Sequence, residues 1–124
     1  MSTGVKDKNA WGKAADWVDY YGLIDGNTVG VAILDFPGNL RHPTTWHVRD
    51  YGLFAANPFG LHDFNSDKTH PHLGDYTVPA DGSVTFRYFL YFHKGTTVDA
   101  HVADLWARVT DPPQVEVNSS ERNR

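Results

Sequence analysis

The sequence predicts a mainly β protein, an antiparallel β-sandwich with one C-terminal α-helix. Aromatic residues make up 14% of the 124 residues and are spread through the middle of the chain, which is typical of a folded β-rich domain. Asp-Gly pairs at residues 25–26 and 81–82 stand between β-rich runs, and such pairs favour hairpin turns because both turn positions need a positive φ. After residue 95 the apolar spacing changes from alternating to helical.

Several runs of the chain have the residues of β-strands. The first ends in WVDYYGLI at residue 24, and the second is TVGVAILDF at 28–36, where Gly30 predicts a close backbone approach or a bulge. The run 46–55 is predicted as one extended segment. Residues 83–93, SVTFRYFLYFH, are apolar on both sides, so we expect both faces of that strand to be covered.

The last predicted element is a helix that follows Lys94-Gly95. Thr96 and Asp99 form a pattern like a capping box at its start, and Asp111-Pro112-Pro113 ends it. The prediction divides the chain into a flexible N-terminus at 1–10, a single β-sandwich-type domain at 11–110 and a polar C-terminal tail at 111–124.

Composition and charge exclude several classes of function. The formal net charge is −4 and no basic run is present, so we expect no nucleic-acid partner. The absence of cysteine excludes disulfides, thiolate metal sites and cysteine nucleophiles. No apolar run approaches the roughly 18–20 residues that cross a bilayer, so we expect no membrane partner. Residues 1–11 lack the apolar core of an export signal, which leaves the cytoplasm as the default location.

The stretch 41–60, RHPTTWHVRDYGLFAANPFG, holds the best candidate site. His47 and Arg49 alternate along one predicted strand, so their side chains project from the same face, and Tyr51 continues that face. Such a row suits an anion or a sugar. The histidine titrates near neutral pH, the arginine offers a fork of hydrogen-bond donors, and the tyrosine offers a flat ring with a hydroxyl. The alternative is the ordinary solvated face of a sheet. The opposite face carries Trp46, Val48 and Phe54.

The candidate catalytic residues are His47, Arg49 and Asp50. Asp50 is one of the two best-placed acids of the folded part, with Asp35 at a strand end. Pairing of Asp50 with Arg41 or Arg49 would lower its pKa and make it a poor acid. No Gly-x-Ser-x-Gly nucleophile motif and no phosphate-binding loop are present.

Polar residues in the neighbouring loops extend the candidate site. His42 precedes a proline, and His62 with Asp63 follows the strand, so these side chains and Asn57 can form a polar pocket at the rim of the sheet. The alternative is turn chemistry, since Asn57-Pro58 and Asp63 favour turns by bonding to their own backbone. The candidate ligand-binding residues are His42, Trp46, Tyr51, Asn57, His62 and Asp63.

His70-Pro71-His72 is the single His-x-His pattern of the chain. In an extended loop both imidazoles can point the same way and supply two of the three or four ligands of a divalent or copper ion. Asp75, Asp63 or His62 would have to complete the site. The alternative is a polar loop with two exposed histidines.

Three segments resemble the PmoA-like family, often labelled methane oxygenase PmoA. They are WGKAADWVDYYGLIDGNTVGVAILDFPGN, RHPTTWHVRDYGLFAANPFGLHDF and DGSVTFRYFLYFHKG, and the match runs from about Trp11 to about Trp106, over the C-terminal part of the family's domain. The resemblance implies a soluble β-sandwich, half or part of a galactose-mutarotase-like supersandwich, and a carbohydrate or sugar-derived ligand. Phe36 stands where family members commonly have histidine. The glutamate that mutarotases use has no counterpart in the domain, because both glutamates lie in the tail.

Three functions follow as hypotheses. The first is the binding or processing of a carbohydrate or sugar-derived small molecule. The second is a copper- or iron-dependent oxidoreductase that uses the histidines, as the family label suggests. The third is a truncated, non-catalytic piece that self-associates as a homo-oligomer to cover the apolar strand at 83–93.

Overall fold

The computed structural model describes residues 1–114. Its main sheet is antiparallel with the strand order β1-β2-β5, formed by β1 (Trp17–Ile24), β2 (Asn27–Asp35) and β5 (Tyr88–Lys94). The turn between β1 and β2 is the predicted hairpin, with Asp25 at φ 49° and Gly26 at φ 77°. The left-handed conformation at both positions matches the twist of the two strands, which confirms the turn predicted from the Asp-Gly pair.

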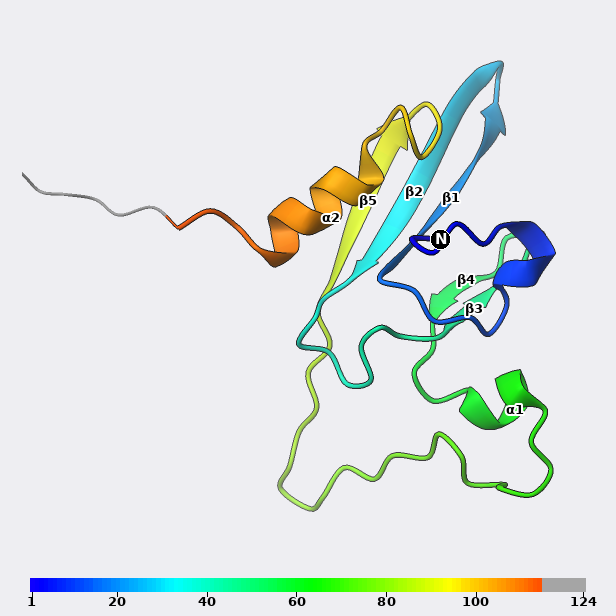
Figure 1. Cartoon of the computed structure of the whole chain (residues 1–124), viewed down its shortest axis with the longest axis vertical. Coiled ribbons are helices and arrows are strands. Elements are labelled where there is room, and N and C mark those ends of the chain that lie inside the picture. The colour runs from blue at the N-terminus through cyan, green and yellow to red at the C-terminus, as the bar shows by residue number, and fades with distance from the viewer. Residues whose placement is uncertain (115–124) are drawn as a thin grey trace, which may run out of the picture.

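A second, two-stranded sheet pairs β3 (Trp46–Val48) with β4 (Phe54–Ala56) (Figure 1). The prediction of one extended run over 46–55 is wrong, because the chain reverses between these strands. Gly52 adopts a positive φ of 101° in the reversal, and the Arg49 N–H donates to the Leu53 carbonyl at 2.8 Å. A helix, α1 (Leu61–Asn65), follows β4.

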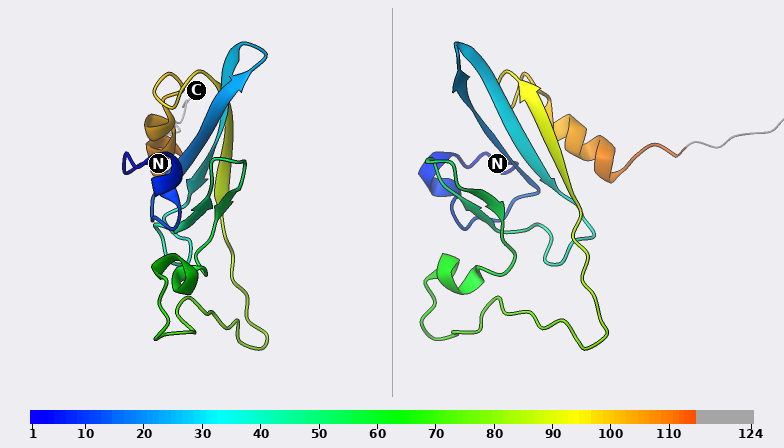
Figure 2. Two further views of the ribbon diagram at one scale, coloured as in Figure 1. Left: turned by 90° about the vertical axis from the view of Figure 1, so that its right-hand side faces the viewer. Right: turned by 180° about the vertical axis from the view of Figure 1, so that it is seen from behind.

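The C-terminal helix α2 (Val102–Thr110) covers one face of the main sheet (Figure 2). Its side chains pack with alternate residues of all three strands, among them Trp17, Leu34 and Phe89. The predicted start at Thr96 and Asp99 does form, with the Thr96 hydroxyl and N–H donating to the Asp99 carboxylate at 2.8 and 2.9 Å. These bonds close a separate turn, because His101 at φ 50° interrupts the helical backbone before α2.

The other face of the main sheet is covered only in part. The β3–β4 hairpin and the first residues of the chain pack there around Val18 and Trp46. Leu90 and Phe92 of β5 remain 60% and 74% exposed. The prediction that both faces of this strand are covered is therefore wrong for one face, and the strand begins at Tyr88 rather than at residue 83.

The turn predicted at 81–82 joins no pair of strands. Asp81 has the expected positive φ of 61°, but residues 75–87 contain no strand. The first ten residues, predicted as a flexible N-terminus, contain the 3-10 helix η1 (Asp7–Ala10), and Ala10 is buried. Of the predicted polar tail 111–124, residues 115–124 lie outside the described residues.

The predicted fold class, mainly antiparallel β with one C-terminal helix, is confirmed. A sandwich is consistent with this arrangement but stays a prediction, because each strand of the second sheet has only 3 residues. Within residues 1–114 no helix has the length and apolar character to cross a membrane.

Candidate functional site

The strand β3 directs its alternate side chains as predicted. Trp46 and Val48 are buried, whereas His47 and Arg49 project from the opposite face. Trp11, from the N-terminal part of the chain, lies against both of them: its ring centroid is 6.2 Å from that of His47, and the Arg49 guanidinium carbon lies 4.5 Å from it. We call Trp11, His47 and Arg49 the arginine corner. Trp11 is 36 positions from His47 in sequence, and no local pattern indicates this contact.

Arg49 also lines a groove on the surface of the described residues. The groove has a volume of about 710 Å³ and runs along the outer edge of β1, where Tyr20 and Tyr21 contribute to its lining. Arg49 and Asp50 belong to the lining, and the N-terminal residues contribute Lys6 and Asp7. Residues 96–98, from the turn before α2, complete the lining. Two of the three predicted catalytic residues thus share one groove, and the third, His47, stands beside it in the arginine corner.

A buried acid–histidine pair adjoins the groove. The Asp19 and His93 side chains are 1% and 2% exposed, and Asp19 Oδ1 lies 2.9 Å from His93 Nε2. The Thr97 hydroxyl donates to the other oxygen of Asp19 at 2.6 Å. Gly30 makes room for this pair, since a Cβ there would lie 2.6 Å from His93 Cε1. The sequence predicts a close backbone approach or a bulge at Gly30. The register through Gly30 is continuous, so there is no bulge, and the close approach is made by the His93 side chain, 63 positions away, rather than by backbone.

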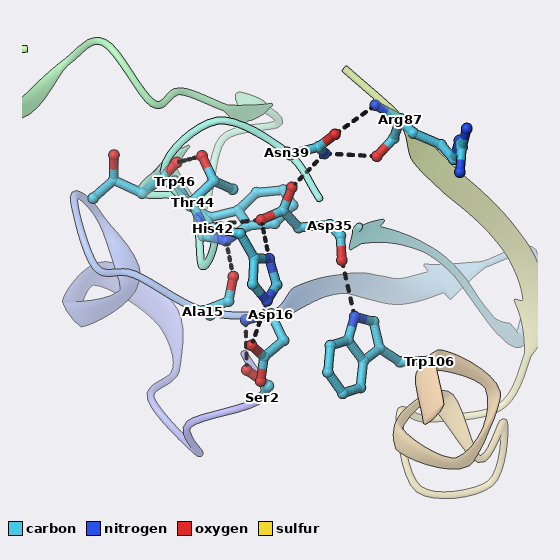
Figure 3. A network of polar contacts seen from close by, with 11 residues as sticks. Ser2, Ala15, Asp16, Asp35, Asn39, His42, Thr44, Trp46, Arg87 and Trp106 are labelled. Atoms are coloured by element: carbon cyan, nitrogen blue, oxygen red, sulfur yellow. Dashed lines mark hydrogen bonds and ion pairs between the residues drawn. The ribbon is translucent and has the colours of Figure 1, made fainter. Parts of the chain in front are cut away.

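His42 belongs to a second polar centre, at the end of β2 (Figure 3). The Asp35 carboxylate is fully buried there and accepts two hydrogen bonds: one oxygen accepts from the Asn39 side-chain amide at 2.7 Å, and the other from the Thr44 N–H at 3.0 Å. The second oxygen also lies 2.7 Å from His42 Nδ1. Asn39 is fixed in turn, because its amide exchanges two hydrogen bonds of 2.7 Å with the Arg87 backbone.

The His42 imidazole lies between two carboxylates. Its Nε2 is 3.5 Å from Oδ1 of Asp16, whose side chain is 39% exposed. The ring stacks on Trp106 of α2 with an interplanar angle of 8°, and the Trp106 indole N–H donates to the Asp35 carbonyl at 3.0 Å (Figure 3). When Nδ1 donates to Asp35, Nε2 is the basic nitrogen and faces the carboxylate nearer to solvent. This arrangement clamps β2, the following loop and α2 together.

The Asp35 charge also acts on a neighbouring tyrosine. Burial and the proximity of Asp35 raise the pKa of Tyr88 above its usual value. Tyr88 therefore keeps its proton at neutral pH, because an ionised phenolate beside a carboxylate is unfavourable.

Other predicted ligand-binding residues have structural roles. Trp46 is a core residue and not part of a binding face, because it is 0% exposed and its indole N–H donates to the Ala15 carbonyl at 2.9 Å. Tyr51 does not continue the His47–Arg49 face, since it lies in the reversal after β3 and is 76% exposed. Asn57 follows the turn alternative: its side-chain oxygen accepts from the Phe59 N–H at 3.0 Å.

The remaining predicted pairings also have local partners. His62 and Asp63 face each other at 3.4 Å on α1, away from the groove lining. Arg41 does not pair with Asp50, because its guanidinium donates to the carbonyls of Pro58, Gly74 and Asp75 at 2.7, 2.6 and 3.0 Å.

The His70 and His72 side chains do not share a site. His70 Nδ1 lies 2.8 Å from Asp67, and His72 Nδ1 lies 2.8 Å from Asp75. Hydrogen bonds from Thr69 and then His70 lower the pKa of Asp67 to about 2. In the described part of the chain no group of three or more His, Cys, Asp or Glu side chains is placed to hold a metal ion.

Comparison with known proteins identifies a family but no function. A family model described as a family of unknown function, DUF6807, matches residues 1–107, which is most of the chain. No curated protein and no solved structure matches this chain.

Proposed function

We propose that this chain, which belongs to the DUF6807 family, binds a carbohydrate or sugar-derived small molecule in the groove along β1. The observation that carries the proposal is the groove itself. Its volume of about 710 Å³ falls within the usual range of small-molecule sites, roughly 300–1,000 Å³. The sequence-predicted residues Arg49 and Asp50 belong to its lining.

The lining combines the chemistry that a sugar needs. Sites for small polar molecules place a few charged groups beside aromatic surface. Asp7 and Asp50 are exposed carboxylates that accept hydrogen bonds from hydroxyl groups, and Arg49 supplies donors. Tyr21 is partly exposed and offers a flat ring with a hydroxyl. The resemblance to the PmoA-like family, which implies a sugar-derived ligand, agrees with this proposal.

Isothermal titration calorimetry of the whole chain against neutral monosaccharides, disaccharides and sugar acids tests the proposal. We expect binding heat with at least one sugar, and loss of that heat in Tyr21→Ala. Tyr51→Ala is the matched control, because Tyr51 is also an exposed tyrosine but is outside the groove lining. Absence of heat with every sugar would refute the proposal, as would equal losses in both variants.

We also propose that the chain self-associates through β5. This strand is at the edge of the main sheet, so its outer backbone groups have no strand partner among the described residues. Leu90 and Phe92 expose apolar surface beside that edge. Natural edge strands usually carry lysine, proline or a bulge against such pairing, and β5 has only Lys94, at its end. A second copy can add its own β5 antiparallel to the first and continue the sheet.

Sedimentation velocity over a range of concentrations tests self-association. We expect a concentration-dependent dimer that Phe92→Lys converts to monomer. Val98→Lys is the control, because Val98 is 80% exposed but lies in the turn before α2 rather than on the sheet. A wild-type chain that stays monomeric at every concentration contradicts this proposal.

A further inference from the structure

Within residues 1–114, the arginine corner contains hydrogen-bond donors that have no acceptor. Among residues 1–114, the indole N–H of Trp11 is the single buried side-chain nitrogen or oxygen without a hydrogen-bond partner. Buried polar groups are nearly always paired, so the Trp11 N–H is unusual, but the nitrogen is enclosed and Trp11 is outside the groove lining. The Arg49 guanidinium stands 4.5 Å from the centre of the same indole ring.

Within the described residues, Arg49 lacks a hydrogen-bond acceptor as well. In the described residues its half-buried guanidinium has no carboxylate oxygen within 4.0 Å and no hydrogen-bond acceptor, although Asp50 is its neighbour in sequence. Arg41 shows the usual solution, with three backbone carbonyls that accept from its guanidinium. Arg49 is therefore a cation held in place by an aromatic ring, with its donors available to a ligand.

The histidines also differ in whether an acidic partner lies close to the ring. All seven histidines lie within the described residues, and six of them have a ring nitrogen within 4.0 Å of an aspartate oxygen. His47 is the exception, and its neighbours are Trp11 and the ring of Phe64. Among the described residues, no acidic oxygen lies within 4.0 Å of a His47 ring nitrogen, whereas the other histidines each have such a partner.

We infer that the sugar-derived ligand of the groove carries an anionic group, a carboxylate or a phosphate, that Arg49 of the arginine corner binds. This inference rests on the proposed function. The planar fork of an arginine matches two oxygens of a carboxylate or phosphate. The charges of the groove agree with a ligand that has both kinds of group: Asp7 and Asp50 can accept from its hydroxyls, and Arg49 and Lys6, which also line the groove, can donate to its acidic group.

D-Glucuronate and D-glucose are suitable probes, because they differ only in a carboxylate in place of a hydroxymethyl group. Calorimetry of the wild-type chain at low salt is expected to give at least about tenfold tighter binding of glucuronate, since hydrogen bonds to a charged group are about twice as strong as neutral ones. Glucose 6-phosphate and inorganic phosphate, titrated in parallel, separate a sugar acid from a sugar phosphate and from a free anion.

Arg49→Gln is expected to abolish the preference for the anionic sugar. Arg87→Gln is the matched control, because the Arg87 guanidinium also lies over an aromatic ring, that of Phe36 at 4.7 Å, but outside the groove lining. A second readout needs only wild-type protein. In ¹H–¹⁵N spectra the indole resonance of Trp11 should move on addition of glucuronate, and those of Trp46 and Trp106, which donate to backbone carbonyls, should not.

The possible outcomes separate the two proposals. Glucose bound as tightly as glucuronate, with no shift of the Trp11 indole resonance, refutes the anionic group and leaves the sugar site standing. Inorganic phosphate bound as tightly as glucose 6-phosphate, with no heat from any non-phosphorylated sugar, supports the anion site and refutes the sugar. Absence of binding by every probe refutes both.

Discussion

Replacement of the buried Asp35 with asparagine tests the polar centre at the end of β2. The carboxylate accepts from Asn39 on one oxygen and from Thr44 on the other, so either orientation of an asparagine amide places an NH₂ group against a donor. Asn39 cannot reverse its amide to adapt, because both of its ends are bonded to the Arg87 backbone. At least one buried donor is left unsatisfied, which costs about 1–3 kcal/mol, and the charge opposite His42 is lost.

We therefore expect Asp35→Asn to lower the free energy of unfolding by about 2–4 kcal/mol. Urea unfolding followed by tryptophan fluorescence measures this as a lower midpoint at an unchanged slope. Asp63→Asn is the control. Asp63 is 80% exposed and faces His62 at 3.4 Å, so we expect a loss below about 0.5 kcal/mol. Equal losses in the two variants would show that the buried network is not a major source of stability.

Two further predictions concern packing and pH. Gly30→Ala places a Cβ 2.6 Å from the His93 ring, so we expect a loss of about 1–3 kcal/mol in urea unfolding, because the sheet or the ring must move. In the folded chain the carboxyl resonance of Asp67 should titrate with a midpoint of about 2 in an NMR pH series, and Thr69→Val should raise that midpoint toward 3.8. Because the folded-state pKa of Asp67 is lowered, its contribution to stability is present above about 3.8 and is lost as the pH falls toward 2.

Both predictions have a clear contrary result. Gly22→Ala is the control for Gly30→Ala, because nothing lies within 4 Å of a Cβ at Gly22, and equal effects of the two substitutions would contradict the close packing at Gly30. An Asp67 midpoint near 3.8 in the wild-type chain would show that the hydrogen bonds from Thr69 and His70 are not formed in solution.

Local patterns predict those parts of the fold that depend on neighbours in sequence. The Asp-Gly pair at 25–26 lies between two strand-forming runs. These two runs pair with each other, so a hairpin forms. The pair at 81–82 adopts the same left-handed backbone at Asp81 but joins no strands. A turn signal therefore predicts a backbone conformation, whereas a hairpin also needs two runs that find a place in a sheet.

For the candidate site as well, the sequence predicts only the features that depend on neighbours along the strand. Alternation along β3 correctly separates His47 and Arg49 from the buried Trp46 and Val48. The partners of this row are not predictable from the strand itself. Trp11 reaches it from the N-terminal part of the chain.

The sequence does not indicate the two acid–histidine pairs, Asp19–His93 and Asp35–His42, and the reason differs between them. Asp19 and His93 are 74 positions apart and meet only because each belongs to a strand that pairs with β2. Asp35 and His42 are only 7 positions apart, and the sequence indicates Asp35 as a well-placed acid, but the loop between them brings the two side chains together. Side-chain direction in an irregular loop has no periodicity from which it can be predicted.

A crystal structure of the chain with D-glucuronate tests the central claim most directly. We predict the sugar in the groove along β1, with its carboxylate within hydrogen-bond distance of the Arg49 guanidinium and with hydroxyl groups facing Asp50. A glucuronate bound away from this groove, or an empty groove in crystals grown at a saturating concentration of the sugar, would contradict it.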